Sequence, residues 1–270
     1  MLVSALFVLA AILYALACAF YLRFLVRGAQ KGSVWSGRVL GAAVGSQLGF
    51  YVADFLAAGH LPFGDIHRAL SNLTLVTVVA FLLLGLRYRQ VNVLGAFLTP
   101  IALLFFLGSA LGRSVEPVPE EVRSLLMPVH VGVNLLGVVA FALAFAFGVA
   151  YILQERLLRR KKLGGLFQRL PSLDVLDTFG LRAVLIGFPL LTLGIVTGAF
   201  WAFRMGPEGP SFVPQQAFAV LAWLVFGAVL LLRVAAGWRG RRAAIGTIVG
   251  FCCAAAVLVS YLVQAGESAS

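Results

Sequence analysis

The chain has 270 residues, of which 61% are hydrophobic and 11% are charged, and its formal net charge is +11. Soluble domains carry about 25% charged residues, so this composition excludes a soluble enzyme, a nucleic-acid-binding domain and a secreted disulfide-rich protein. A basic excess would suggest nucleic acid in a soluble chain, but in a membrane protein basic residues collect on cytoplasmic loops.

Eight segments are apolar enough to cross a bilayer as helices, which takes roughly 20 residues each. In chain order they cover residues 2–26, 38–59, 69–87, 91–112, 127–154, 180–204, 213–235 and 243–265. The segments are continuously apolar and not alternating, which favours helices over the strands of a barrel. We therefore predict an all-α polytopic bundle of eight transmembrane helices that forms a single integral membrane domain over residues 1–270.

The basic residues alternate between the loops. Of the 21 Lys and Arg residues, 17 fall in or beside the first, third, fifth and seventh loops, and most acidic residues fall on the opposite side of the membrane. The positive-inside rule therefore predicts a multi-pass protein of the cell (inner) membrane, with the N- and C-termini on the non-cytoplasmic side.

The fifth loop carries a dense basic run over residues 155–162. Such a run is typical of the end of a span, and it could also hold anionic lipid at about 1 kcal/mol per charge. Residues 163–176 are expected to form a short amphipathic segment on the cytoplasmic surface. We favour the first interpretation, a basic flank of the fifth span at the surface of the lipid bilayer, and expect no nucleic acid partner.

Glycines recur every four residues in two of the predicted spans. Gly41, Gly45 and Gly49 share one face of the second span, and Gly194 and Gly198 share one face of the sixth. Such faces let neighbouring helices approach closely, so these glycines predict packing and no chemistry.

Three histidines, His60, His67 and His130, all map to the predicted outer side of the membrane. A neutral imidazole is a good ligand for haem iron, and three histidines at one depth could converge on a common site. The alternative is that each imidazole bonds water or a carbonyl group at the interface.

Two polar residues inside the spans could support such a site. Asp54 lies on the helix face that leads toward His60, and an acid in the membrane is costly unless it is paired or lines a cavity. Its expected partners are His60 or Arg68. Asn134 lies one helical turn from His130.

Other chemistries find no support in the residue pattern. The three cysteines lie inside spans without a C-x-x-C pair, which disfavours a thiol oxidoreductase. No nucleophile, base and orienting group occur together, so we do not expect an enzyme. A solute transporter is disfavoured, because the two halves of the chain show no clear similarity.

Several runs, in order and with plausible spacing from about residue 40 onward, resemble the cytochrome c assembly protein family, the haem-handling membrane proteins of the CcsA and HemX type. The runs are Gly59-His60-Leu61-Pro62-Phe63, Met127-Pro128-Val129-His130-Val131, Leu170-Pro171-Ser172-Leu173 followed by Asp174 and Asp177, Gly187-Phe188-Pro189-Leu190-Leu191-Thr192-Leu193-Gly194, Gly198-Ala199-Phe200-Trp201-Ala202, and Gly237-Trp238-Arg239-Gly240-Arg241-Arg242-Ala243-Ala244.

The resemblance implies a bundle that handles haem on its outer face for attachment to apocytochromes. Full members of the family use four histidines as two axial pairs and a tryptophan-rich outer loop ending in W-x-W-D-P. This sequence keeps one histidine of each pair, His60 and His130, while Leu231 and Glu267 stand where the other two are expected. The signature tryptophans are absent, and His67 is an additional histidine.

The first functional hypothesis is a haem-binding protein of cytochrome c assembly. Haem b is its implied cofactor, with His130, His60 and His67 as the candidate binding residues. His130 or His60 would bind the iron, and His67, Met127 or Met205 would be the second ligand. Its partner would be another membrane cytochrome c assembly protein. The alternative is a HemX-like regulator or adaptor of haem biosynthesis, which needs no haem and docks a soluble haem-biosynthesis enzyme on the fifth loop.

Overall fold

The structure is a computed structural model that describes residues 1–28, 30–58, 66–110, 126–204 and 214–267. Within these ranges the chain forms helices and no strand, which confirms the all-α prediction. Eight helices are long and apolar enough to cross a membrane, and they confirm the eight predicted spans of a multi-pass protein: Leu2–Arg27, Val34–Ala57, His67–Arg87, Arg89–Gly108, Val129–Arg159, Leu173–Phe200, Gln215–Ala235 and Arg241–Gln264.

The helices group into two compact units, and each is described by itself. The first unit contains α1 (Leu2–Arg27), α2 (Gln30–Ala58), α3 (Ile66–Arg87), the 3₁₀ helix η1 (Arg89–Leu94), α4 (Gly95–Gly108), the end of α5 and the short α6 (Leu166–Arg169). The second unit contains α5 (Leu126–Arg159) as far as Tyr151, α7 (Leu173–Arg204) from Asp174 onward, α8 (Pro214–Ala235) and α9 (Arg241–Glu267). The single domain over residues 1–270 stays a prediction.

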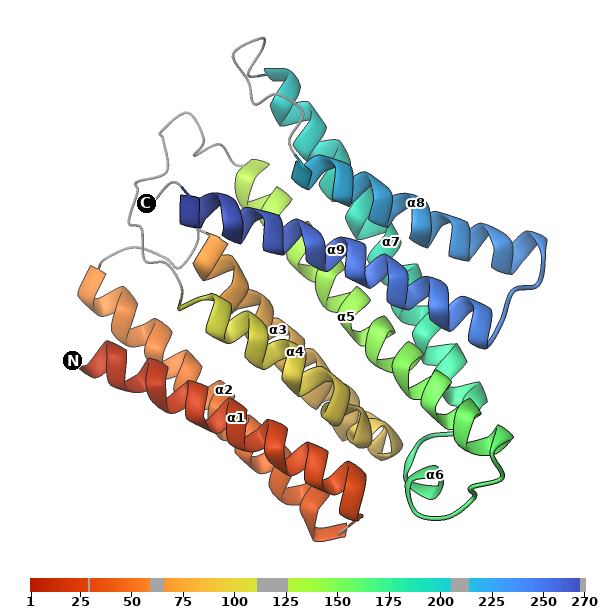
Figure 1. Cartoon of the computed structure of the whole chain (residues 1–270). Helices are drawn as coiled ribbons and strands as arrows, with labels where there is room; N and C mark the ends of the chain where they lie inside the picture. The colour runs from red at the N-terminus through yellow and green to blue at the C-terminus, as the bar shows by residue number, and fades with distance from the viewer. Residues whose placement is uncertain (29, 59–65, 111–125, 205–213, 268–270) are drawn as a thin grey trace. The chain divides into compact units, whose positions relative to one another are not determined.

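In the first unit, α1 packs along α2, and α4 packs against both α1 and α3 (Figure 1). A buried polar cluster links α1, α2 and α3. The Tyr14 hydroxyl donates to Gln47 Oε1 at 2.6 Å, Gln47 Nε2 donates to the Ser71 carbonyl at 2.8 Å, and the Tyr51 hydroxyl donates to Ser71 Oγ at 2.9 Å. In a bilayer no water can satisfy these groups, so the hydrogen bonds fix how the three helices meet.

The loop after α5 docks on the end of α1. Arg169 Nη1 donates to the carbonyl oxygens of Leu25 and Val26, both at 2.8 Å, which satisfies acceptors that a helix end leaves open. Gly28 ends α1 with a φ of 71°, and a Cβ there would overlap the Arg169 guanidinium. The prediction of one amphipathic segment over residues 163–176 is wrong. This stretch contains a loop with a four-residue helix, and α7 already begins at Leu173.

The glycine faces behave differently in the two units. A Cβ at Gly41 or Gly45 on α2 would meet no atom within 4 Å, and one at Gly49 would touch only the Leu6 side chain. The predicted close packing is therefore wrong at Gly41 and Gly45 within the first unit, and only Gly49 is in contact with α1, through Leu6. At Gly194 and Gly198 on α7 the prediction is confirmed, since α5 side chains lie directly against both glycines.

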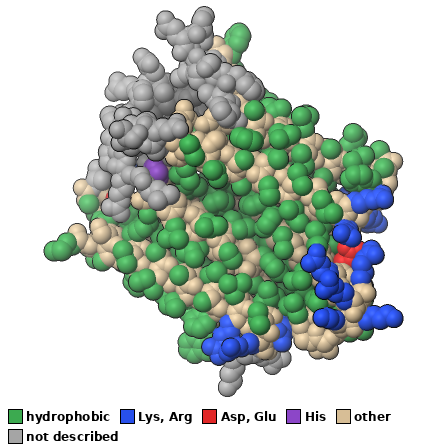
Figure 2. Space-filling model, viewed as in Figure 1, with side chains coloured by type: hydrophobic (Ala, Val, Ile, Leu, Met, Phe, Trp, Pro, Cys, Tyr) green, Lys and Arg blue, Asp and Glu red, His purple; other side chains and the backbone are tan. Residues whose placement is uncertain are grey.

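In the second unit, α5 and α7 run antiparallel, and α8 packs along α9 (Figure 1). The start of α5 meets the end of α7 at His130 and Thr197, whereas Phe147 and Phe179 stack where α5 ends and α7 begins. Phe141 of α5 also stacks on Phe226 of α8 with ring centroids 3.8 Å apart. Figure 2 shows hydrophobic side chains covering most of the described part of the viewed face, as a surface in contact with lipid requires.

Candidate functional site

His130 is anchored to α7 by a hydrogen bond of its ring. His130 lies in the first turns of α5, and its Nδ1 is 2.9 Å from Oγ1 of Thr197 near the end of α7. The side chain is half-buried. The imidazole is therefore held between two antiparallel helices while His130 stays partly exposed.

Asn134 and two glycines complete the surroundings of this ring. Asn134 Nδ2 donates to the carbonyl oxygen of His130 at 2.7 Å and lies 3.4 Å and 3.3 Å from the two ring nitrogens. A Cβ at Gly194 would overlap the Asn134 side chain, and one at Gly198 would lie 3.0 Å from His130 Cε1. These glycines, predicted to serve packing alone, make the room in which both polar side chains fit. We call this group of His130, Asn134, Gly194, Thr197 and Gly198 the His130 site.

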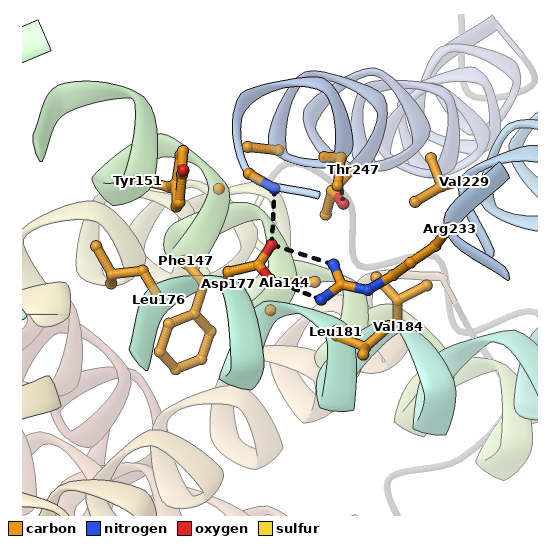
Figure 3. Close-up of a pocket in the computed structure, with 15 residues that line it drawn as sticks. Ala144, Phe147, Tyr151, Leu176, Asp177, Leu181, Val184, Val229, Arg233 and Thr247 are labelled. Atoms are coloured by element: carbon orange, nitrogen blue, oxygen red, sulfur yellow. Dashed lines mark hydrogen bonds and ion pairs between the residues drawn. The ribbon is translucent and has the colours of Figure 1, made fainter. Parts of the chain in front are cut away.

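A second polar site lies at the opposite end of α7 (Figure 3). Arg233, in the last turn of α8, donates from Nη1 to Asp177 Oδ1 at 3.1 Å and from Nη2 to Oδ2 at 2.6 Å. The backbone N–H of Gly240, just before α9, donates to Asp177 Oδ1 at 3.0 Å. The Asp177 carboxylate thus links α7 to α8 through a bidentate ion pair and to the start of α9 through a hydrogen bond from the backbone. We call Asp177, Arg233 and Gly240 the Asp177 clasp.

The clasp borders a cavity of about 30 Å³, lined mainly by apolar side chains of α5, α7 and α9. A water needs roughly 10–15 Å³ measured in this way, whereas sites for organic ligands are many times larger. The cavity therefore accepts a water or two, and the clasp acts as a connection between helices.

The remaining predicted site residues fall in the first unit or outside the described residues. His67 is buried between α3 and α4, with Nδ1 3.3 Å from the Gly108 carbonyl oxygen. Arg68 Nη2 lies 3.8 Å from Asp54 Oδ2, so of the two expected partners of Asp54 the structure shows Arg68. His60 lies outside the described residues, as does Met205, and the Met127 side chain is likewise not described. The described residues contain no group of three or more His, Cys, Asp or Glu side chains that could hold a metal ion.

The sequence does not predict two features of these sites, the pairing of Asp177 with Arg233 and the role of Thr197. Asp177 and Arg233 are 56 positions apart, so the sequence does not show that they pair. The sequence also predicts that the sixth span begins at residue 180, which leaves Asp177 outside it. An acid among many cations was the available signal. Thr197 gave no signal, because a threonine inside a span normally bonds only its own helix.

Comparison with known proteins identifies the family. The sequence model of the family described as "Cytochrome C assembly protein" matches residues 63–266. The chain belongs to this family. It is 31% identical to the "Cytochrome c biogenesis protein CcsA" of Prochlorococcus marinus (strain AS9601) over 230 residues, which cover 76% of this chain and 73% of that protein.

Two further relatives carry the same name. The chain is 28% identical to the protein of Mesostigma viride, over 76% of this chain and 78% of that protein. It is 29% identical to the protein of Synechococcus elongatus (strain ATCC 33912 / PCC 7942 / FACHB-805), over 74% and 75%. None of the solved structures matches the chain significantly.

The structure also explains why the family-like runs belong together. The run ending at Asp177 and the run containing Gly240 meet in the Asp177 clasp. The run containing His130 meets α7 at Gly194 and Gly198, the ends of two further runs. These stretches, far apart in the sequence of this cytochrome c assembly family member, therefore converge on two places in the second unit.

Proposed function

We propose that this protein handles haem as a membrane component of cytochrome c assembly, and that His130 is an axial ligand of the haem iron. The cargo would be haem b, bound without a covalent bond. The anchored imidazole of His130 is the observation that carries the proposal. Histidines that bind metals almost always use their second ring nitrogen for an orienting hydrogen bond, and His130 makes such a bond to Thr197.

The surface beside His130 suits a porphyrin. Phe200 follows Thr197 by three residues and therefore lies next to it on the helix surface, and its side chain is 45% exposed. Haem presents a large apolar ring that aromatic side chains cover well. His130 would bind the iron and Phe200 would cover part of the ring, while haem itself supplies the redox-active iron.

His130 is a better candidate than His67 on grounds of access. His67 is 7% exposed and engages the backbone of α4, which leaves no space for a porphyrin at its ring. We assign His67 to the packing of the first unit. His60, Met127 and Met205 remain candidates for the second iron ligand.

The charge distribution supports an orientation in the inner membrane. The described cationic side chains of the second unit lie at the clasp end of its helices: Arg182, Arg233, Arg239, Arg241 and Arg242. Basic residues favour the cytoplasm, so we propose that His130 and the C-terminus lie on the non-cytoplasmic side, and the even number of predicted spans puts the N-terminus on that side too. There the protein would act with another membrane cytochrome c assembly protein.

The visible spectrum of the protein, purified in mild detergent from a haem-replete host, tests the proposal. We expect a Soret band at nearly one haem per protein, lost in His130→Ala and kept in His67→Gln, which retains a donor for the Gly108 carbonyl. His60→Ala reports whether that residue is the second ligand. A wild-type protein without haem would refute the proposal.

A HemX-like adaptor of haem biosynthesis is the second candidate, favoured by the exposed basic cluster after α5. Arg160, Lys161 and Lys162 are all exposed and could dock a soluble, acidic haem-biosynthesis enzyme. Pull-down of such an enzyme should fail when these three residues are changed to Gln. The matched control changes the exposed Arg239, Arg241 and Arg242 of the second unit instead, and equal loss in both variants would exclude a specific docking surface.

A further inference from the structure

The hydroxyl group of Thr197 has only one hydrogen, and its neighbours determine where that hydrogen points. Thr197 Oγ1 lies 2.7 Å from the Leu193 carbonyl oxygen and 3.1 Å from that of Gly194. Carbonyl oxygens only accept hydrogen bonds. The 2.7 Å between Thr197 Oγ1 and the Leu193 carbonyl oxygen therefore requires the hydroxyl hydrogen to lie between these two oxygens. Thr197 therefore donates to its own helix.

The bond from Thr197 to His130 must then be made by the imidazole. Thr197 Oγ1 lies 2.9 Å from His130 Nδ1, and with the hydroxyl hydrogen already used, this bond needs a hydrogen on Nδ1. A neutral imidazole carries one N–H, and its other nitrogen is an acceptor. Nδ1 is thus the protonated nitrogen, and Nε2 carries the lone pair.

Asn134 does not consume that lone pair. Its Nδ2 is 3.3 Å from Nε2 and 3.4 Å from Nδ1, so it is almost equally distant from both. A lone pair on a ring nitrogen points outward in the plane of the ring, and a donor aligned with it would lie much farther from the other nitrogen. The Asn134 amide therefore lies against the ring and limits its rotation.

We propose that Thr197 is a positioning residue that fixes His130 as the Nδ1–H tautomer and presents the Nε2 lone pair to a ligand. That this ligand is haem iron rests on the proposed function, whereas the tautomer rests on the hydrogen bonds alone. The bond made by one ring nitrogen determines which nitrogen binds a metal. Here the acceptor belongs to a rigid helix, so the imidazole is oriented before any ligand arrives.

The tautomer can be measured in the haem-free protein. ¹⁵N NMR of histidine-labelled protein in lipid bilayers distinguishes a protonated from an unprotonated ring nitrogen, and His130→Gln assigns the signals among the three histidines. At a pH where the ring is neutral, we expect the proton on Nδ1 in the wild type. In Thr197→Val the proton should shift toward Nε2, and in Thr197→Ser, which keeps the hydroxyl, it should remain on Nδ1.

Thr247→Val is the matched control. Thr247 also bonds the carbonyl oxygen four residues earlier in its helix, that of Ala243, at 2.9 Å, and the same substitution there should leave the His130 signals unchanged. A wild-type ring protonated on Nε2 would overturn the proposal without any variant. An unchanged tautomer in Thr197→Val would also overturn it.

Haem titration of the same proteins separates this inference from the proposed function. Loss of an orienting hydrogen bond typically weakens metal binding about 10- to 100-fold, so we expect Thr197→Val to bind haem that much more weakly and Thr197→Ser to approach the wild type. If the wild type shows the Nδ1–H tautomer but takes up no haem, the proposed function fails and the role of Thr197 stands. If Thr197→Val changes the tautomer but not the haem affinity, Thr197 does not position an iron ligand.

Discussion

The two ends of α7 carry polar sites of opposite character. Asp177 and Thr197 are 20 positions apart, which corresponds to about 30 Å along a helix and to roughly the thickness of a bilayer core. At the Asp177 end, the charged carboxylate of Asp177 pairs with Arg233 of α8 and accepts a hydrogen bond from the backbone just before α9. At the Thr197 end the partners of the histidine are a hydroxyl group and an amide, and the described residues form no ion pair there.

This difference separates a structural site from the proposed binding site. In the Asp177 clasp both carboxylate oxygens accept hydrogen bonds from the protein, and its small cavity admits only water. In the His130 site Nδ1 lies 2.9 Å from Thr197 Oγ1, and the tautomer proposed above leaves the Nε2 lone pair for a ligand, with the Asn134 amide 3.3 Å from that nitrogen. A buried polar group that is already satisfied stabilises the fold, whereas an oriented group with an open acceptor indicates a ligand.

The largest effect on stability is expected from breaking the clasp. Arg233→Ala would leave the Asp177 carboxylate, whose side chain is 16% exposed, with one backbone donor. Removing one partner of a buried ion pair costs about 3–5 kcal/mol. We expect a loss of about 3 kcal/mol in the free energy of unfolding, measured by SDS titration in mixed micelles. The double variant Asp177→Asn/Arg233→Gln should lose less, and a double variant no more stable than Arg233→Ala would show that the ion pair is not the connection.

A smaller effect is expected from filling the space beside His130. In Gly194→Ala the new methyl group would overlap Asn134, and such overpacking costs about 1–3 kcal/mol. The variant should unfold more easily and bind haem more weakly. The matched control is Gly45→Ala on α2, where the methyl group meets open space and should be neutral or stabilise the helix by up to about 1 kcal/mol. Equal losses in the two variants would contradict the role given to Gly194.

The smallest effect is expected from an exposed ion pair. Arg159 bonds Glu155 at 2.7 Å, with the Glu155 side chain 14% exposed but the Arg159 side chain 70% exposed, whereas both side chains of the clasp pair are largely buried. Pairs one helical turn apart with an exposed member contribute about 0.3–0.5 kcal/mol. Arg159→Ala should therefore change the free energy of unfolding by no more than about 0.5 kcal/mol. A loss comparable to that of Arg233→Ala would mean that burial does not distinguish the clasp from other ion pairs.

The eight helices could be predicted because they depend on local composition, and the family because its sequence runs occur here in order. A span needs a run of apolar residues, and such runs are visible in the sequence. The role of the α2 glycines could not be predicted, because the same spacing occurs at Gly41 and Gly45, which face open space, and at Gly194 and Gly198, which face α5. Only the packing of neighbouring helices distinguishes these two cases.

The sequence by itself determined the class of this protein: a membrane-spanning, all-helical member of the cytochrome c assembly family with few polar residues inside its spans. It also named His130, together with His60 and His67, as a candidate haem ligand, because histidines are rare in so apolar a chain. The tertiary structure decided what those polar residues contact. A hydrogen bond acts over about 3 Å, so the partners of His130 and Asp177 depend on helices separated by tens of residues, and only the fold brings those helices together.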